Sequence, residues 1–282
     1  MIRILHLSDP HFGAADSAVA AAFLTRAAEL APDLTLLSGD LTMRARRGEL
    51  ASARKFVDAL PSPRLVIPGN HDIPGMNQPI DRFVRPFHRY QGTFGHELEP
   101  EYRAEGVHIV SLNSTRAFGL HADWSEGRLQ NSQLRRVDQQ FAGGAPALRV
   151  LMLHHPLLAP EGYGRAVVHP LPDLIESIHR SNVDLVLCGH FHRSHLAILA
   201  ADGKWQSIVS QAATVCSTRL QGEPNGFHEI ISSGEQMEII RHRFVAGSFV
   251  PDADFLFHRS AAGWSVVHTD GSNARVSVLE GD

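Results

Sequence analysis

The chain is expected to form an α/β fold in which a parallel sheet is followed by an antiparallel one. Strand-like and helix-like segments alternate through the first two-thirds of its 282 residues. From about residue 195 onward, short β-prone runs follow one another, separated by polar or glycine-containing turns. Alternating strands and helices are typical of parallel sheets with right-handed crossovers, whereas consecutive short strands are typical of antiparallel sheets.

The first elements form a βαβαβ pattern. Strands are predicted at residues 2–7, 34–37 and 65–67, and helices at residues 17–30 and 48–60. Asp16 or Ser17 could cap the first helix, which is rich in alanine. Pro61 and Pro63 end the second helix because proline cannot continue one. This part of the chain therefore predicts three parallel strands.

The helical pattern is less regular between residues 73 and 102, where we expect a cap segment over the sheet edge. A helix around residues 79–90 carries Arg82, Arg85 and Arg89 there, which more often indicate a solvated face than a binding site. Further strands are predicted at residues 107–112, 150–153 and 183–188, and further helices at residues 130–141 and 171–181.

The last predicted strands should form a second, antiparallel sheet packed on the first. They lie at residues 196–200, 205–209, 227–231 and 237–244. We expect one domain over residues 1–245 and a C-terminal extension over residues 246–282. Two alternatives stay open for the extension, a mobile tail and an oligomer contact such as a homodimer interface.

Composition excludes several classes of partner. A formal net charge of −4 gives no electrostatic case for a nucleic-acid or membrane-surface partner. No run approaches the roughly 18 to 20 apolar residues of a membrane span. The chain begins directly with a strand, and Cys188 and Cys216 are its only cysteines. We therefore expect a cytoplasmic protein in which Cys188 is a buried free thiol.

Acidic and histidine-bearing blocks follow five of the apolar runs. They are Asp9-Pro10-His11, Gly39-Asp40, Gly69-Asn70-His71-Asp72, His154-His155-Pro156 and Gly189-His190-Phe191-His192. Because the carboxyl ends of parallel strands meet at one edge of a sheet, we expect one shared site. In extended backbone Asp9 and His11 would project to the same side, as would His190 and His192. Asp40 has two carboxylate oxygens and could bridge two ions. Seven oxygen and nitrogen ligands are too many for one tetrahedral ion and suit a two-metal centre.

This ordered set resembles the calcineurin-like metallophosphoesterases, whose pattern is D-x-H, G-D, G-N-H-D/E, H and G-H-x-H. The resemblance covers about residues 2–195 and implies a four-layer αββα sandwich of two mixed sheets flanked by helices. It implies one metal on Asp9, His11, Asp40 and His192, and a second on Asp40, Asn70, His154 and His190. The family writes its fourth block H-x-P, which selects His154 over His155, although the reverse assignment stays open. Mixed nitrogen and oxygen ligands accept Mn, Fe, Zn or Co.

The resemblance also implies a reaction. Water between the two metals would lose a proton and attack phosphorus in line with the leaving group. His71 would lie beside the phosphate, where it would stabilise charge or protonate the leaving oxygen. Asp72 would orient His71 and favour its protonated form. The expected substrate is a small-molecule phosphoester.

The segment from Arg3 to Gly13 narrows the resemblance to bacterial class III cyclic-nucleotide phosphodiesterases and related glycerophosphodiesterases. A UDP-2,3-diacylglucosamine-type pyrophosphohydrolase is an alternative, but such enzymes typically carry Arg where His71 stands. A phosphomonoesterase is another alternative. A nuclease should show a basic groove, which the acidic balance disfavours. A non-catalytic scaffold should have lost ligands, and none is missing here.

Overall fold

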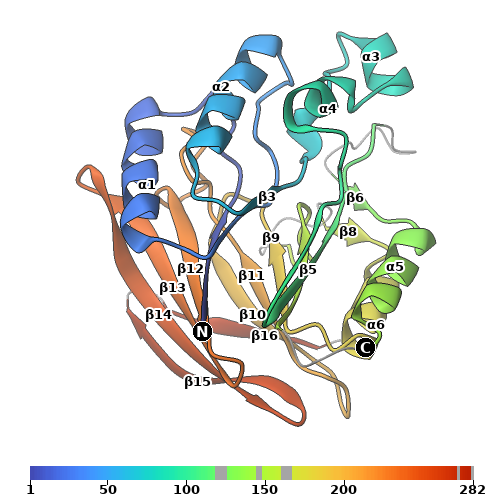
Figure 1. Ribbon diagram of the computed structural model, residues 1–282, viewed down its shortest axis with the longest axis vertical. Helices are drawn as coiled ribbons and strands as arrows, with labels where there is room; N and C mark the ends of the chain where they lie inside the picture. Colours follow the sequence, from blue (N-terminus) through green and yellow to red (C-terminus); the bar gives the residue numbers. More distant parts are fainter. Residues whose placement is uncertain (118–125, 144–147, 160–166, 272–273, 281–282) are drawn as a thin grey trace.

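Two mixed sheets pack face to face with helices on both outer sides, which confirms the expected αββα sandwich (Figure 1). The computed structural model describes residues 1–117, 126–143, 148–159, 167–271 and 274–280. Within these ranges each large sheet has seven strands. No helix in these ranges is both long and apolar enough to cross a membrane.

The first sheet has the strand order β15-β14-β13-β12-β1-β2-β3. In chain order its strands are β1 (Ile2–Leu7), β2 (Leu34–Leu37), β3 (Arg64–Val66), β12 (Gly226–Ser232), β13 (Gln236–Val245), β14 (Ser248–Ser260) and β15 (Gly263–Gly271). The pairings of β1 with β2 and of β2 with β3 are parallel, as the βαβαβ pattern predicted. The crossover helices α1 (Ser17–Leu30) and α2 (Arg47–Ala59) cover the outer face of this sheet (Figure 1).

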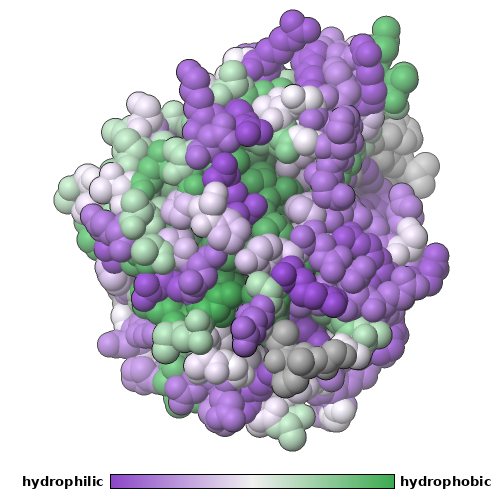
Figure 2. Space-filling view, in the orientation of Figure 1, coloured by the Kyte–Doolittle hydropathy of each residue, from purple (hydrophilic) through white to green (hydrophobic). Residues whose placement is uncertain are grey.

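The second sheet has the order β16-β10-β11-β9-β7-β5-β4. Its strands are β4 (Glu101–Ala104), β5 (Val107–Leu112), β7 (Leu148–Leu153), β9 (Leu185–Cys188), β10 (His195–Ala200), β11 (Ser207–Gln211) and β16 (Val276–Glu280). Its outer face is covered by α5 (Asn131–Phe141) and α6 (Leu171–Arg180) (Figure 1). The short strands β6 (Gly127–Arg128) and β8 (Val168–His169) pair separately. Hydrophilic side chains cover most of the side on which α5 lies (Figure 2).

The expected separate antiparallel sheet is wrong. Strands β12 to β15 extend the first sheet from β1, and β10 and β11 extend the second sheet from β9. The free edges of β1 and β9 present unpaired backbone groups, and the later strands satisfy both. Period-two alternation identifies a strand but does not indicate the edge with which it pairs.

Residues after 245 continue the same two sheets. β14 pairs with β13 directly after a turn, and β16 pairs with β10. The boundary expected at residue 245 therefore falls within a hairpin of the first sheet. Within the expected cap segment lie α3 (Pro79–Val84) and α4 (His88–Phe94).

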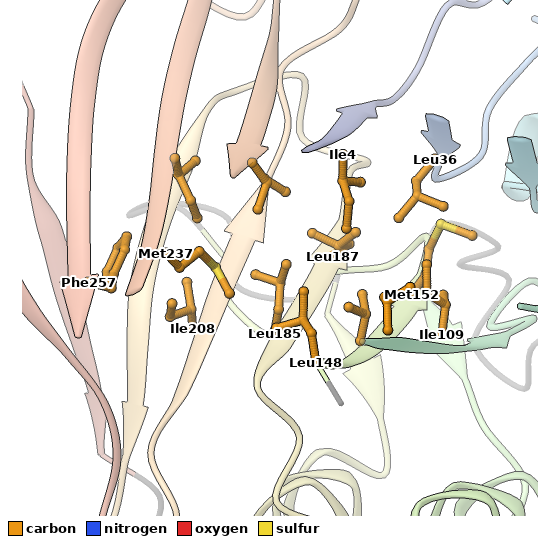
Figure 3. Packing of buried hydrophobic residues seen from close by; sticks show 14 of the residues in the cluster. Ile4, Leu36, Ile109, Leu148, Met152, Leu185, Leu187, Ile208, Met237 and Phe257 are labelled. Carbon is orange, nitrogen blue, oxygen red and sulfur yellow. The ribbon is translucent and has the colours of Figure 1, made fainter. Parts of the chain in front are cut away.

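The layer between the sheets is apolar along most of its length. Ile4, Leu36, Ile208, Ile230 and Ile239 are fully buried there, and Figure 3 shows part of this cluster. Full burial of such a side chain contributes about 1.5–3 kcal/mol. Separate apolar clusters lie under the helices on each outer face.

The same inward-facing rows become polar toward the carboxyl end of β1. Two residues beyond Ile4 stands His6, and two residues from Ile230 stands His228, its direct cross-strand partner. Arg241 in turn is the cross-strand partner of His228. We name His6, His228 and Arg241 the polar row. His6 is the member of the row nearest the candidate metal centre, since its Nε2 lies 3.0 Å from Oγ of Ser38, and the Ser38 carbonyl oxygen lies 2.8 Å from His154 Nδ1.

Candidate metal centre

Three of the predicted ligands converge on one point at the carboxyl end of β1. His11 Nε2 and His192 Nε2 lie 2.8 Å apart. Asp9 Oδ1 lies 3.4 Å from His192 Nε2 and 3.7 Å from His11 Nε2. All three residues are buried, although the loops that carry them are about 180 residues apart in sequence.

A second group forms around His154. Its Nε2 lies 3.2 Å from Asn70 Oδ1, 3.3 Å from His190 Nδ1 and 3.4 Å from Asp40 Oδ2. Asp40 Oδ2 also lies 3.5 Å from His11 Nε2. The Asp40 carboxylate is therefore shared by both groups, as its expected bridging position requires.

The backbone presents these side chains in an unexpected conformation. Asp9 and His11 have φ of 55° and 48°, Asp40 has 53°, and His190 and His192 have 78° and 56°. These residues are in the left-handed region, not in extended strand, so the reason given above for their common direction is wrong. Left-handed φ costs a non-glycine residue about 1–3 kcal/mol and is concentrated at functional sites. The strands end before each ligand, and strained turns direct the ligands inward.

The glycines before the ligands permit close approach of the backbone. A Cβ on Gly189 would lie 1.8 Å from Ser8 Oγ and 2.5 Å from Asp9 Oδ2. A Cβ on Gly69 would lie 2.2 Å from Asp40 Oδ1. No side chain fits at either position, so these two glycines are more than turn formers.

Backbone carbonyls fix the orientation of three imidazoles. The Nδ1 atoms of His11, His154 and His192 lie 3.3, 2.8 and 2.7 Å from the carbonyl oxygens of Thr42, Ser38 and Arg219. If each Nδ1–H donates to its carbonyl, the Nε2 lone pair faces the cluster, which is the usual arrangement of metal-binding histidine. Two such lone pairs 2.8 Å apart repel each other unless a cation or a proton lies between them.

The electrostatics of the cluster favour a bound cation. Burial alone would lower the pKa of His154, but the carboxylates of Asp40 and Asp9 raise it to about 9. Burial and the neighbouring His154 lower the pKa of His190 to about 3. Asp9 Oδ1 is buried and accepts no hydrogen bond from the described residues. The neighbouring carboxylates thus favour positive charge at this position, and the donor set of the cluster fits divalent metal ions.

His155 lies at the edge of the cluster. Its Nδ1 is 2.8 Å from Ser114 Oγ, and its ring centroid is 4.8 Å from that of His190. One of its ring nitrogens lies within 4.8 Å of ligand atoms of His154 and His190. His154, not His155, contacts Asp40 and Asn70, which favours the expected choice between the two.

His71 is near the cluster, but Asp72 does not orient its ring. His71 Nδ1 lies 2.8 Å from the carbonyl oxygen of Met43. The Asp72 carboxylate instead accepts hydrogen bonds from the amides of Leu41, Thr42 and Gly69 and from the Thr42 hydroxyl. These contacts connect the loops after β2 and β3, so the orienting role expected for Asp72 is corrected to a structural one. The carbonyl oxygen of Met43 takes the orienting position.

A cavity of about 750 Å³ opens onto the cluster and includes residues that sequence reasoning missed. Arg219 lines it, and its Nη1 lies 3.4 Å from His71 Nε2. Nothing in the sequence singled out Arg219, because it lies in a loop outside every motif. The expected cap segment contributes Ile73, Met76 and Arg82 to the lining. The two other arginines expected in the cap segment, Arg85 and Arg89, form ion pairs with Asp81.

The chain matches the calcineurin-like phosphoesterase family over residues 2–194. It belongs to that family. A probable cyclic nucleotide phosphodiesterase of Synechococcus is 32% identical over 63% of this chain and 64% of its own length. A cAMP/cGMP dual specificity phosphodiesterase of Mycobacterium tuberculosis is 29% identical over 77% of this chain and 68% of its own length. The matched region thus spans about two-thirds of each relative.

A solved structure shares the fold. The structure of PhoD superposes with a TM-score of 0.73 at 11% identity, covering 99% of this chain and 74% of that one. At this identity the likeness concerns the fold alone.

Proposed function

We propose that this protein is a binuclear metal-dependent phosphodiesterase that hydrolyses a small-molecule phosphodiester, with a 3′,5′-cyclic nucleotide as the leading candidate. The observation that carries the proposal is the Asp40 carboxylate, which lies within 3.5 Å of imidazoles of both ligand groups. One shared carboxylate between two groups of oxygen and nitrogen donors is the arrangement expected of a two-metal site. The names of the two relatives support the choice of a diester.

The proposed ligand sets follow the two groups. Asp9, His11 and His192 would hold one ion, and Asn70, His154 and His190 the other, with Asp40 common to both. Such ions would lower the pKa of water toward neutrality and accept phosphoryl charge. The carbonyls of Thr42, Ser38 and Arg219 hold the imidazoles in place, so no reorganisation is needed when substrate binds.

His71 and Arg219 would bind the phosphate within the cavity, next to the ligand histidines. With its Nδ1–H donated to Met43, His71 presents Nε2 toward the Arg219 guanidinium, and both residues line the cavity. A guanidinium binds phosphate oxygens bidentately, and an imidazolium with a second proton on Nε2 can stabilise charge on the leaving oxygen or protonate it. In this proposal Arg219 would bind the phosphate, and His71 in its protonated form would act on the leaving oxygen.

A hydrolysis panel with Mn-loaded protein tests this function. It compares bis-p-nitrophenyl phosphate, p-nitrophenyl phosphate, cyclic AMP, a glycerophosphodiester and UDP-diacylglucosamine. We expect the diesters to be hydrolysed faster than the monoester, and chelator treatment to abolish activity until metal is restored. A monoester rate far above every diester rate would contradict the phosphodiesterase assignment. Metal binding without turnover of any compound would indicate a scaffold.

A further inference from the structure

A second cavity, of about 920 Å³, lies between β13 and β14 of the first sheet and β10 and β16 of the second. Among the described residues, four arginines line it, Arg193, Arg241, Arg243 and Arg275. We name it the arginine cleft. None of its described lining residues also lines the cavity at the metal centre. Neither the family motifs nor the proposed hydrolysis assigns it a role.

The cleft lies where the inward-facing side chains of β13 change from apolar residues to arginines. Met237 and Ile239 of this strand are buried between the sheets. Arg241 and Arg243 follow at the same spacing and line the cleft instead. A guanidinium at an inward-facing position costs free energy unless it is paired, so packing alone does not explain two of them.

Carboxylates neutralise only part of this charge. Arg193 and Arg243 lie 3.9 and 4.0 Å from Glu223, and Arg243 lies 3.2 Å from Asp252, which also pairs with Arg241. Arg275 forms no ion pair with any residue in the described part of the chain. Within the described part of the chain, four guanidinium groups therefore face two carboxylates, so positive charge is in excess there.

Part of the remaining wall of the cleft is apolar. Leu158 and Leu279 line it and are half-buried, so each keeps some surface that a ligand can contact. A cavity of this size suits a small organic ligand, and guanidinium groups match the geometry of phosphate and carboxylate oxygens. We propose that the arginine cleft binds a second ligand, an organic phosphate whose anionic group contacts Arg193 and Arg275 and whose apolar body contacts Leu158 and Leu279.

The test measures binding of phenylphosphonate to the metal-loaded protein by isothermal titration calorimetry. This probe has a phosphate-like dianion and an aromatic body, and its carbon–phosphorus bond is not a phosphoester. The cleft variant is Arg193→Gln/Arg275→Gln, which changes a side chain that is 44% exposed and a second exposed one. The matched control is Arg47→Gln/Arg135→Gln, which removes the same charge from exposed positions of α2 and α5.

Any binding at the metal centre contributes equally to all three proteins. We expect the cleft variant to show no binding of phenylphosphonate at the cleft, or binding that is at least about tenfold weaker. The control should bind phenylphosphonate as the wild type does. Identical isotherms for the cleft variant and the wild type would overturn the proposal. Inorganic phosphate that binds the cleft as tightly as phenylphosphonate would overturn its organic part. Thermal unfolding of each variant checks that both remain folded.

Discussion

The two ends of the inter-sheet layer are formed by the same strands but differ in polarity: one end is apolar and the other carries polar side chains. At one end Ile4, Ile230 and Ile239 fill the space between the sheets. At the other end the same rows carry His6, His228 and Arg241. Side chains two residues apart on a strand point to the same face of the sheet but contact different neighbouring residues. The fold thus separates stability from chemistry by position along the strand.

The polar row is buried but hydrogen-bonded. His6 Nε2 lies 3.0 Å from Ser38 Oγ, and His228 lies 2.8 Å from Ser210 Oγ and 2.7 Å from Ser194 Oγ. Burial lowers the pKa of His6 to about 3 and that of His228 well below its usual range. Both rings are therefore neutral, and they add no positive charge beside the carboxylates of the metal centre.

The largest expected effect lies at the shared carboxylate. Asp40→Ala should abolish metal binding at both positions and with it hydrolysis, because this residue contributes to both ligand groups. Metal content by elemental analysis and diester hydrolysis measure the two losses. Asp202→Ala, at an exposed turn, serves as the control. A variant that keeps two metals per chain would contradict the bridging assignment.

We expect His71 to contribute to kcat without binding a metal ion. His71→Ala should keep both metals and lower kcat by about 10²- to 10⁴-fold, the usual contribution of a positioned acid or base. Steady-state kinetics on the metal-loaded variant, with its metal content measured in parallel, check this. If the variant has the wild-type rate, His71 has no part in the reaction.

The apolar end should govern stability instead. Ile230→Ala removes a fully buried side chain and should lower the free energy of unfolding by about 2–5 kcal/mol. Urea denaturation measures the loss, and kcat of the remaining folded protein should be unchanged. Val278→Ala, at a 65% exposed position of β16, should have little effect. A large fall in kcat for Ile230→Ala would show that the two ends are not separable.

The sequence identified the candidate ligand residues because their chemistry and order are local signals. Asp9, His11 and the later blocks each follow a readable apolar run, and parallel strands bring such ends together. The left-handed turns at Asp40 and His190 could not be predicted, since glycine and not Asp or His usually indicates positive φ. Their strain is compensated by contacts between loops that are distant in sequence.

Other features of the structure could not be predicted, because they depend on contacts between segments that are distant in the sequence. Arg219 reaches His71 from a loop with no motif. Arg241 and Arg243 alternate with their neighbours as a solvated strand face would, although they line a cleft between the sheets. In each case the residue type was readable, but its neighbours depend on which sheet edge its strand joined.

The smallest expected effect is on the pH dependence of the free energy of unfolding, to which His228 in the polar row contributes. The pKa of His228 is lowered in the folded protein, so unfolding takes up a proton below its unfolded value of about 6.5. The stability due to neutral His228 is present above that pH and is lost as pH falls through and below it.

His228→Gln retains an amide that can bond Ser194 and Ser210 but cannot titrate. At pH 8 it should cost about 1 kcal/mol through imperfect hydrogen bonds. Between pH 6.5 and pH 5 the wild type should lose up to about 1.4 kcal/mol per pH unit more than the variant. Urea titrations of both proteins across this range measure the difference, with His268→Gln at an exposed position of β15 as the control. Parallel pH profiles for His228→Gln and the wild type would mean that His228 becomes protonated in the folded protein. His228 would then add positive charge to that of Arg241, and the polar row would differ from the apolar end more strongly in charge.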